Sequence, residues 1–248
     1  MINRRRFIAT GTSGLLLGGC DRLNNSAQFR GVLRSAEKLT MASQRLISPR
    51  DALAREFRES DISPIFRSNG TRVPGTDEYA QHAAEQFANW RLQVDGLVTH
   101  PLSIPLRTLR TLPHKTQITR HDCVEGWSAI GKWHGLELSR ILDQAGLSTR
   151  AKYIVFHCAD RFGEKPYYES IDLIDAFHPQ TIIAWGMNGH LLPVPNGAPL
   201  RLRVERQLGY KQAKYIQRIQ AVDSLSGVYG GKGGYWEDNV DYEWYAGI

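Results

Sequence analysis

The sequence predicts one mixed α+β domain that is rich in short strands and follows an N-terminal helical arm. From Trp90 onward, short runs alternate apolar with polar residues, which is the pattern of half-buried strands. The segments with apolar residues at helical spacing are short and lie between these runs. With 248 residues, of which 42% are hydrophobic, the chain is long enough to bury a single sizeable core. A disordered or fibrous protein is therefore excluded.

The positive charge of the chain is concentrated near its N-terminus. The formal net charge is +6, but residues 1–60 contain 11 Lys and Arg against 5 Asp and Glu, whereas residues 61–248 contain 20 of each kind. A neutral body lacks the cluster of cations that would neutralise many phosphates, so nucleic acid is not an expected partner. The excess of basic residues near the N-terminus instead indicates export and contact with a membrane surface.

Residues 1–20 have the pattern of an export signal. Three arginines at positions 4–6 precede an apolar, glycine-rich stretch at 9–19, which is shorter than the roughly 20 residues that span a bilayer. Adjacent arginines before x-Phe resemble the twin-arginine signal, whose pathway carries proteins already folded around a cofactor. An ordinary secretory signal with extra arginines is the alternative.

Residues 17–20, Leu-Gly-Gly-Cys, resemble a bacterial lipobox. Cys20 would then carry lipid and become the mature N-terminus, and Asp21 resembles the signal that retains some lipoproteins at the inner membrane. Each buried methylene of an acyl chain contributes about 0.8 kcal/mol, so several chains would hold the domain firmly at the membrane. A chance cysteine near a cleavage site is the other interpretation.

Residues 21–62 are expected to form the helical arm, and residues 63–225 the main domain. Apolar side chains recur at a loose helical spacing from 28 to 59, and Pro49 predicts a break between two helical pieces. Residues 63–75 are rich in Pro, Gly, Asn and Arg, which indicates an irregular loop of the kind that often carries ligand-binding groups.

The main domain is expected to combine strands with two short helices. The predicted strands are 90–98, which ends at a hairpin turn, 117–120, 153–156, 182–185 and 200–204. The predicted helices are 135–147, which Gly146 stops, and 170–177. Cys123 then lies at the end of one strand, and Cys158 follows another. Residues 226–248 are a tail of glycine and aromatic residues that could form a lid or pack on the domain surface.

The three cysteines allow two interpretations. If Cys20 carries lipid, Cys123 and Cys158 could form a disulfide, which an oxidising periplasm permits. Alternatively, one of them is kept as a thiolate for metal chemistry, because soft sulfur ligands suit soft or high-valent metals. The sequence contains none of the ordinary zinc-binding spacings, which disfavours zinc.

Two ordered blocks of the sequence resemble a known enzyme family. Residues 120–128, RHDCVEGWS, are followed by WHGL at 133–136. The second block runs from GMNG at 186–189 through LP at 192–193 and NGAPLRL at 196–202 to GYK at 209–211 and KYI at 214–216. Both blocks resemble the sulfite-oxidase-fold molybdopterin enzymes, especially the catalytic subunits of the bacterial periplasmic protein-methionine-sulfoxide reductases. With FRSN at 66–69, the resemblance covers roughly residues 63–220.

The resemblance implies a sulfite-oxidase molybdopterin-binding fold with molybdenum-molybdopterin as its cofactor. Cys123 would be the metal ligand and the catalytic residue. The cofactor-binding residues would be Asn69, Cys158, Asn196, Arg201, Gly209, Tyr210, Lys211 and Lys214. The cofactor phosphate needs cations and backbone N–H donors, which Arg201, Lys211 and the 209–210 backbone could supply. Strand alternation alone would leave Arg201 exposed, and Cys158 could equally be a buried apolar residue.

The resemblance also implies a function. We expect a periplasmic oxidoreductase, anchored to the inner membrane, that transfers an oxygen atom from a sulfoxide-type substrate with electrons from a membrane haem subunit or cytochrome. A sulfite dehydrogenase of the same fold and a non-catalytic exported binding lipoprotein are the alternatives. The residues that could shape the substrate pocket are Arg72, Trp127, His157 and Tyr168. The oligomeric state stays open.

Overall fold

The computed structural model describes residues 26–248, so the predicted export signal and Cys20 lie outside the described residues. Contacts divide the chain into one unit of residues 1–49 and another of residues 50–248. The described part of the first unit is mainly helix α2 (Ala27–Ile47), whose N-cap Ser26 accepts a hydrogen bond from the Phe29 amide. Between residues 26 and 248, no helix combines the length and the apolar character needed to cross a membrane.

The second helical piece predicted after Pro49 is wrong. Residues 52–58 run extended beside strand β3 (Lys115–Cys123), where the Phe57 amide donates to the Ile118 carbonyl at 2.9 Å. In the same extended segment, the Ala54 amide donates to the side chain of Gln180 at 2.7 Å. These long-range hydrogen bonds outweigh the weak local helical spacing.

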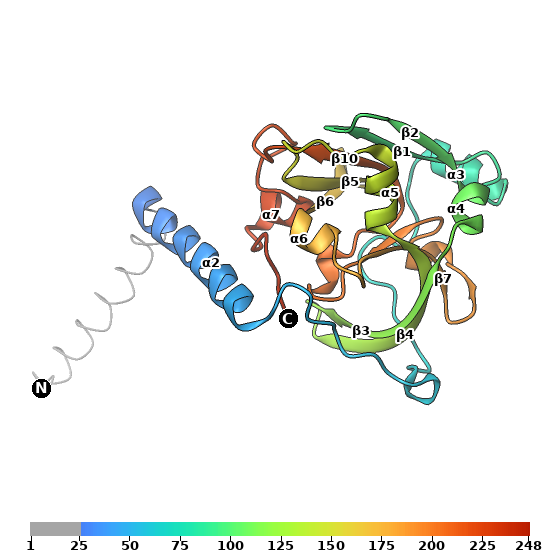
Figure 1. Ribbon diagram of the computed structural model, residues 1–248, viewed down its shortest axis with the longest axis horizontal. Coiled ribbons are helices and arrows are strands. Elements are labelled where there is room, and N and C mark those ends of the chain that lie inside the picture. The colour runs from blue at the N-terminus through green and yellow to red at the C-terminus, as the bar shows by residue number, and fades with distance from the viewer. Residues whose placement is uncertain (1–25) are drawn as a thin grey trace, which may run out of the picture. The chain divides into compact units, whose positions relative to one another are not determined.

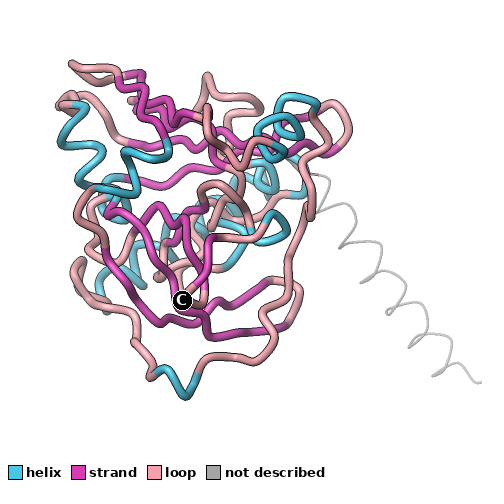
Figure 2. The backbone as a smooth tube through the Cα atoms, turned by 90° about the vertical axis from the view of Figure 1, so that its right-hand side faces the viewer, coloured by secondary structure: helices cyan, strands magenta, loops and turns pink. Residues whose placement is uncertain are grey.

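The main unit contains two five-stranded sheets (Figures 1 and 2). In the first, β1 pairs parallel with β10 and all other neighbours are antiparallel. Its order is β2 (Leu102–Pro105), β1 (Arg91–Gly96), β10 (Ile216–Val222), β5 (Tyr153–Phe162) and β6 (Lys165–Asp172). The second sheet is antiparallel, with the order β3, β4 (Trp127–Glu137), β7 (Ile182–Met187) and β8 (His190–Leu191), and β9 (Arg201–Arg203) also pairs with β7.

Short helices connect the strands of the two sheets. The predicted hairpin after 90–98 is confirmed as the β1–β2 pair, and residues 63–75 are an irregular loop as expected. The helices are α3 (Asp77–Ala84), α4 (Leu106–Thr111), α5 (Leu138–Ala145), α6 (Leu173–Ala176) and α7 (Tyr235–Val240), with the 3-10 turns η1 (Glu59–Asp61), η2 (Val194–Asn196) and η3 (Gly209–Lys211).

The core explains why the strand at 182–185 is apolar throughout. Ile183 and Trp185 belong to the main core that both sheets share. Ile182, Ala184 and Met187 point to the other face, where they form a second cluster around Trp133. Because both faces of β7 are covered, the strand has no polar face and its sequence does not alternate.

Both predicted helices of the main domain begin later than expected. Gly135 lies in β4, where it pairs with Ala184 and where a Cβ atom would meet the Ile183 carbonyl oxygen at 2.3 Å. This glycine therefore serves close strand packing, and α5 starts only at Leu138. Ser170 lies in β6, where it pairs with Val155 of β5. Helix α6 therefore has only four residues. Cross-strand pairing decides both boundaries.

Strand β5 is longer than the predicted 153–156 and runs on to Phe162. Cys158 therefore lies inside the strand, opposite Ile216 of β10, instead of following the strand.

The C-terminal tail packs on the main unit. Helix α7 contacts β6, and the two lie side by side in Figure 1. The Ile248 amide donates to the Arg206 carbonyl at 3.0 Å, and the Leu208 amide donates to the Ala246 carbonyl at 2.9 Å. The end of the chain is thus part of the fold.

Candidate functional site

One cavity lies where several distant segments of the main unit meet. Together with the space at its open mouth it takes in about 710 Å³. Its lining comes from residues 69–71, the turn 123–125, Asp160 and Phe162 of β5, Tyr167 of β6, Gly209, Tyr210, Gln212 and Lys214, and Trp236 and Tyr242 of the tail.

Cys123 is the last residue of β3 and lines this cavity. It pairs with Trp127 across a tight turn, in which Gly126 has a φ of +85° and donates its amide to the Cys123 carbonyl at 3.0 Å. The Cys123 thiol is free and largely buried. Burial raises its pKa, and the charge of Arg201 acts in the opposite direction. The strand end thus presents one soft sulfur to the cavity.

Cys158 does not line the cavity. Its side chain packs in the main core, and burial raises the pKa of its thiol well above the usual value. Like Cys123 it is a free thiol, so the disulfide that the sequence allows is not formed. This placement fits the interpretation of Cys158 as a buried apolar residue.

Lys214 fastens the loop 69–71 at the edge of the cavity. Its Nζ donates to the carbonyl oxygens of Asn69 at 2.6 Å and Pro195 at 3.1 Å. Burial, with the charge of Arg201, lowers the pKa of Lys214 to about 7. The Oδ1 atom of Asn69 is buried and has no hydrogen-bond partner within residues 26–248.

Arg201 is fully buried, which corrects the exposure that strand alternation predicts. Strand β9 is covered on both faces, because Leu202 packs in the core while the guanidinium of Arg201 lies 5.4 Å from the centroid of the Trp133 ring. Burial lowers the pKa of Arg201 to about 9. Its Nη1 donates to the Asn196 carbonyl at 3.2 Å. In the described part of the chain, Nε and Nη2 of Arg201 and Nδ2 of Asn196 have no partner.

These buried atoms fit the cofactor that the resemblance predicts. A buried polar group without a partner costs about 1–3 kcal/mol, so three unpartnered donors and the free Oδ1 of Asn69 call for a polar ligand. A phosphate or pterin oxygen would accept from Arg201 and Asn196, and a pterin N–H would donate to Asn69. Arg201 and Asn196 are not part of the lining, but Arg201 donates to the Asn196 carbonyl, and Lys214 of the lining donates to the carbonyl of the neighbouring Pro195.

Gly209 and Tyr210 both line the cavity. A Cβ atom at Gly209 would lie 2.5 Å from the His121 ring, so only glycine lets this backbone approach β3 so closely. Tyr210 donates its hydroxyl to the Glu243 carbonyl at 2.5 Å. The backbone of residues 209–210, which is expected to supply N–H donors to the cofactor phosphate, is thereby held against β3 on one side and the C-terminal tail on the other.

Lys211 does not reach the cavity. Its Nζ lies 2.5 Å from Oε2 of Glu169 and 2.6 Å from Oε1 of Glu237, and all three side chains are buried. Coulomb attraction to these carboxylates outweighs desolvation, so the pKa of Lys211 is raised. Because its ammonium is already neutralised, Lys211 is not placed to hold a phosphate.

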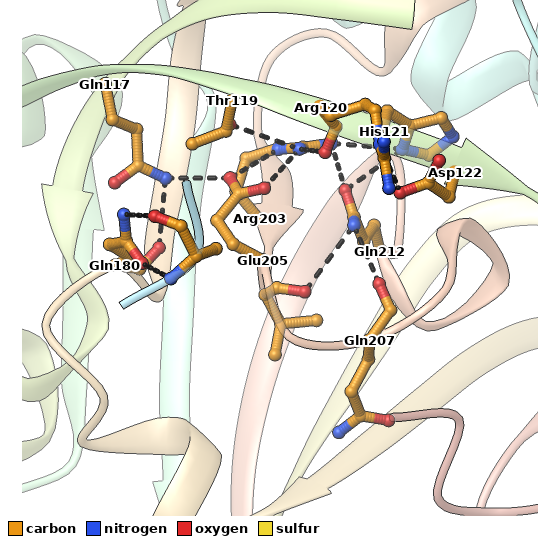
Figure 3. Close-up of polar contacts among 12 residues, drawn as sticks. Gln117, Thr119, Arg120, His121, Asp122, Gln180, Arg203, Glu205, Gln207 and Gln212 are labelled. Carbon is orange, nitrogen blue, oxygen red and sulfur yellow. Dashed lines mark hydrogen bonds and ion pairs between the residues drawn. The ribbon is translucent and has the colours of Figure 1, made fainter. Parts of the chain in front are cut away.

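A buried polar network connects the Cys123 strand to the segment after η3 (Figure 3). Arg203 donates through Nε and Nη2 to Glu205 at 2.9 and 2.5 Å. Its Nη1 contacts Nδ1 of His121 at 3.1 Å and also donates to Gln212. His121 stands two residues before Cys123, and Gln212 lines the cavity. The network therefore fixes two walls of the cavity relative to each other.

Sequence reasoning missed Asp160 and most of the aromatic lining. Asp160 is buried, lines the cavity and has its pKa raised to about 6 by burial. A carboxylate that directly follows the largely apolar run 153–159 was the available signal. The aromatic lining residues Phe162, Tyr167, Trp236 and Tyr242 come from separate segments, and no local pattern joins them.

The residues expected to shape the pocket lie elsewhere. Arg72 is absent from the lining, and Trp127 packs against Phe66 and His121. His157 hydrogen-bonds Tyr229 and Gln220, and Tyr168 donates to Asp238.

Comparison with known proteins shows what the chain resembles. The family model for the oxidoreductase molybdopterin binding domain matches residues 79–229. A protein of Azospira oryzae, provisionally named protein-methionine-sulfoxide reductase subunit YedZ1, is 38% identical over 232 residues, which cover 94% of this chain and 82% of that protein. The solved structure of the sulfane dehydrogenase SoxCD from Paracoccus pantotrophus matches with a TM-score of 0.53 at 21% identity, over 62% of this chain. Only 42% of that solved chain is covered, so this similarity concerns the fold.

Proposed function

Because this chain belongs to the family of oxidoreductase molybdopterin-binding domains, we propose that it removes the oxygen atom from a sulfoxide-type substrate in the periplasm. Family membership makes the chain an oxidoreductase with molybdenum-molybdopterin as its cofactor, on a sulfite-oxidase fold. The observation that carries the proposal is the free thiol of Cys123 in a cavity bordered by buried polar atoms without partners.

Different residues of the chain would hold different parts of the cofactor. The Cys123 thiolate would bind the metal, and Arg201, Asn196 and Asn69 would hydrogen-bond the phosphate and the pterin. Lys214 keeps the loop that carries Asn69 in place through its bonds to backbone carbonyls. The bound cofactor supplies two-electron oxygen-atom transfer.

The reductive direction is supported by the name of the Azospira relative, which refers to a methionine-sulfoxide reductase. In that direction the sulfoxide accepts two electrons and two protons and yields a thioether and water. We propose that a membrane haem subunit or cytochrome supplies the electrons. Asp160, whose carboxyl lies in the cavity wall, is a buried group that can hold a proton there.

A substrate panel tests this function. The purified holoenzyme is assayed with a reduced dye as electron donor against organic sulfoxides, N-oxides and sulfoxide-containing peptides. Sulfite is assayed separately with an oxidised acceptor. Dye oxidation that depends on sulfoxides supports the proposal. Turnover of sulfite alone identifies a sulfite dehydrogenase, and metal-free protein from a molybdenum-replete host supports a non-catalytic binder.

The proposed location rests on the sequence of residues 1–20. The arginines at 4–6, the apolar stretch and Cys20 support twin-arginine export followed by lipid anchoring at the inner membrane. An anchored catalytic domain would also be held close to a membrane electron donor.

Replacing Cys20 with alanine is expected to release the protein from the membrane. Without a lipid attachment site, the apolar contribution of the acyl chains is lost and the protein should appear in the soluble periplasmic fraction. Fractionation followed by immunoblotting measures this shift, with Cys158→Ala as the control that removes a thiol from the folded domain. A Cys20→Ala protein that still sediments with membranes contradicts the lipid anchor.

A further inference from the structure

The tail contributes two aromatic side chains to the cavity that contains Cys123. Trp236 of α7 and Tyr242 just after it both line the cavity. They lie beyond residue 229, outside the region that the domain family shares. The tail is therefore a part of this chain that can adapt the common cavity to a particular substrate.

Five lining residues form a continuous group of rings, which we name the aromatic wall: Phe162, Tyr167, Tyr210, Trp236 and Tyr242. The ring centroid of Trp236 lies 5.3 Å from that of Phe162 and 6.0 Å from that of Tyr242. Tyr242 in turn lies 5.1 Å from Tyr210, and Phe162 lies 6.0 Å from Tyr167. These separations are typical of packed aromatic pairs.

Most other side chains that line the cavity are polar, and they differ in chemistry from the aromatic wall. They include Asn69 and Lys214, which are joined by the hydrogen bond from Lys214 Nζ to the Asn69 carbonyl, and Gln212. The amine of Lys214 and the carboxyl groups of Glu125 and Asp160 also line the cavity. Lys214 already donates to backbone carbonyls, and none of the five side chains of the aromatic wall is a cation that could bind a small oxyanion.

Buried ion pairs hold the tail in this position. Glu237, next to Trp236, contacts Nζ of Lys211 at 2.6 Å, and the same ammonium contacts Glu169 at 2.5 Å. Farther along, Nε1 of Trp244 donates to the Ser170 hydroxyl at 2.9 Å. Because Lys211, Glu169 and Glu237 are buried together, separating them would leave unpaired polar groups in the interior, so these contacts hold the tail against the cavity.

We propose that the aromatic wall binds the apolar substituents of an organic sulfoxide, with Trp236 and Tyr242 as specificity-determining residues. This inference rests on the proposed function. A thioether sulfoxide joins one polar S–O group to apolar carbon, and aromatic faces contact methyl groups and sulfur favourably. The wall therefore selects neutral sulfoxides with sizeable substituents, such as a methionine sulfoxide residue, over small oxyanions.

Kinetics of Trp236→Ala and Tyr242→Ala holoenzymes test this assignment. The KM for N-acetylmethionine sulfoxide is expected to rise by about tenfold or more, the scale of losing a few apolar contacts in a binding pocket, while kcat changes little. The KM for dimethyl sulfoxide, which has less apolar surface, should change less. The Kd for the unreactive N-acetylmethionine sulfone, measured by calorimetry, should rise by the same factor as the first KM.

Trp244→Ala is the matched control, because Trp244 lies in the same tail but contacts Tyr153 and Ser170 instead of lining the cavity. This variant loses the hydrogen bond to Ser170, but Lys211 still holds the tail through Glu237, so its KM values should stay near the wild-type level. Equal KM increases in Trp244→Ala and Trp236→Ala, or an unchanged KM in Trp236→Ala with an active wild type, overturn the assignment. A wild type that reduces no sulfoxide overturns the proposed function instead, and the sulfone Kd then still reports on the wall.

Discussion

Replacing Cys123 with serine is expected to give a folded protein that retains little molybdenum and almost no activity. The side chain sits at the end of β3 and lines the cavity, so an oxygen in place of sulfur changes the volume little and should leave the strand pairing with Trp127 intact. It removes the one soft ligand that β3 presents to the cavity. We expect turnover to fall by at least about 10³-fold, the scale seen when a group at the reacting centre is removed.

The comparison variant is Cys158→Ala, which removes the other buried thiol of the described chain. Cys158 packs in the core and its Sγ makes only a long contact of 3.9 Å to the Phe156 carbonyl. This variant should lose some stability and keep its metal. Molybdenum per chain is measured by mass spectrometry, and near-ultraviolet circular dichroism checks the fold. A Cys123→Ser protein with one molybdenum per chain and wild-type turnover would rule out the ligand role.

Local patterns predicted β1, β3, β5, β7 and β9 but not the other five strands of the two sheets. The alternation at 90–98 and the apolar run at 182–185 correspond to β1 and β7. The errors occur where partners distant in sequence decide the structure. Gly135 and Ser170 were assigned to helices because their neighbours have helical spacing, whereas both belong to strands through pairing with Ala184 and Val155.

In the candidate site, too, features set by the local sequence could be predicted, whereas features set by contacts between distant segments could not. The position of Cys123 at a strand end follows from the sequence, and the structure places its thiol in the cavity. The burial of Arg201 could not be predicted, because it depends on Trp133 of the distant strand β4 covering its side chain. The sequence predicts Lys211 as a phosphate ligand, whereas in the fold Glu237 of the distant C-terminal tail neutralises it.

Replacing Arg203 with methionine is expected to cause the largest loss of stability among simple substitutions in the cavity walls. Arg203 is fully buried and donates twice to Glu205, which is also buried. Removing the cation leaves this carboxylate with only the 2.8 Å hydrogen bond from Gln117 as a remaining side-chain partner in the described chain. Breaking a buried ion pair in this way costs about 3–5 kcal/mol. Urea unfolding of the cofactor-free protein measures the loss.

The double variant Arg203→Met/Glu205→Leu separates the cost of an orphaned charge from the value of the pair itself. Apolar replacement of both partners of a buried pair is often close to neutral, so the double variant should recover most of the stability that Arg203→Met loses. It also removes the contact of Arg203 with His121, which stands two residues before Cys123. If the network exists to position that strand, the double variant should be stable and yet bind molybdenum less well. A double variant as unstable as Arg203→Met would instead show that packing of the guanidinium on Trp133, 4.2 Å from the ring centroid, carries the stability.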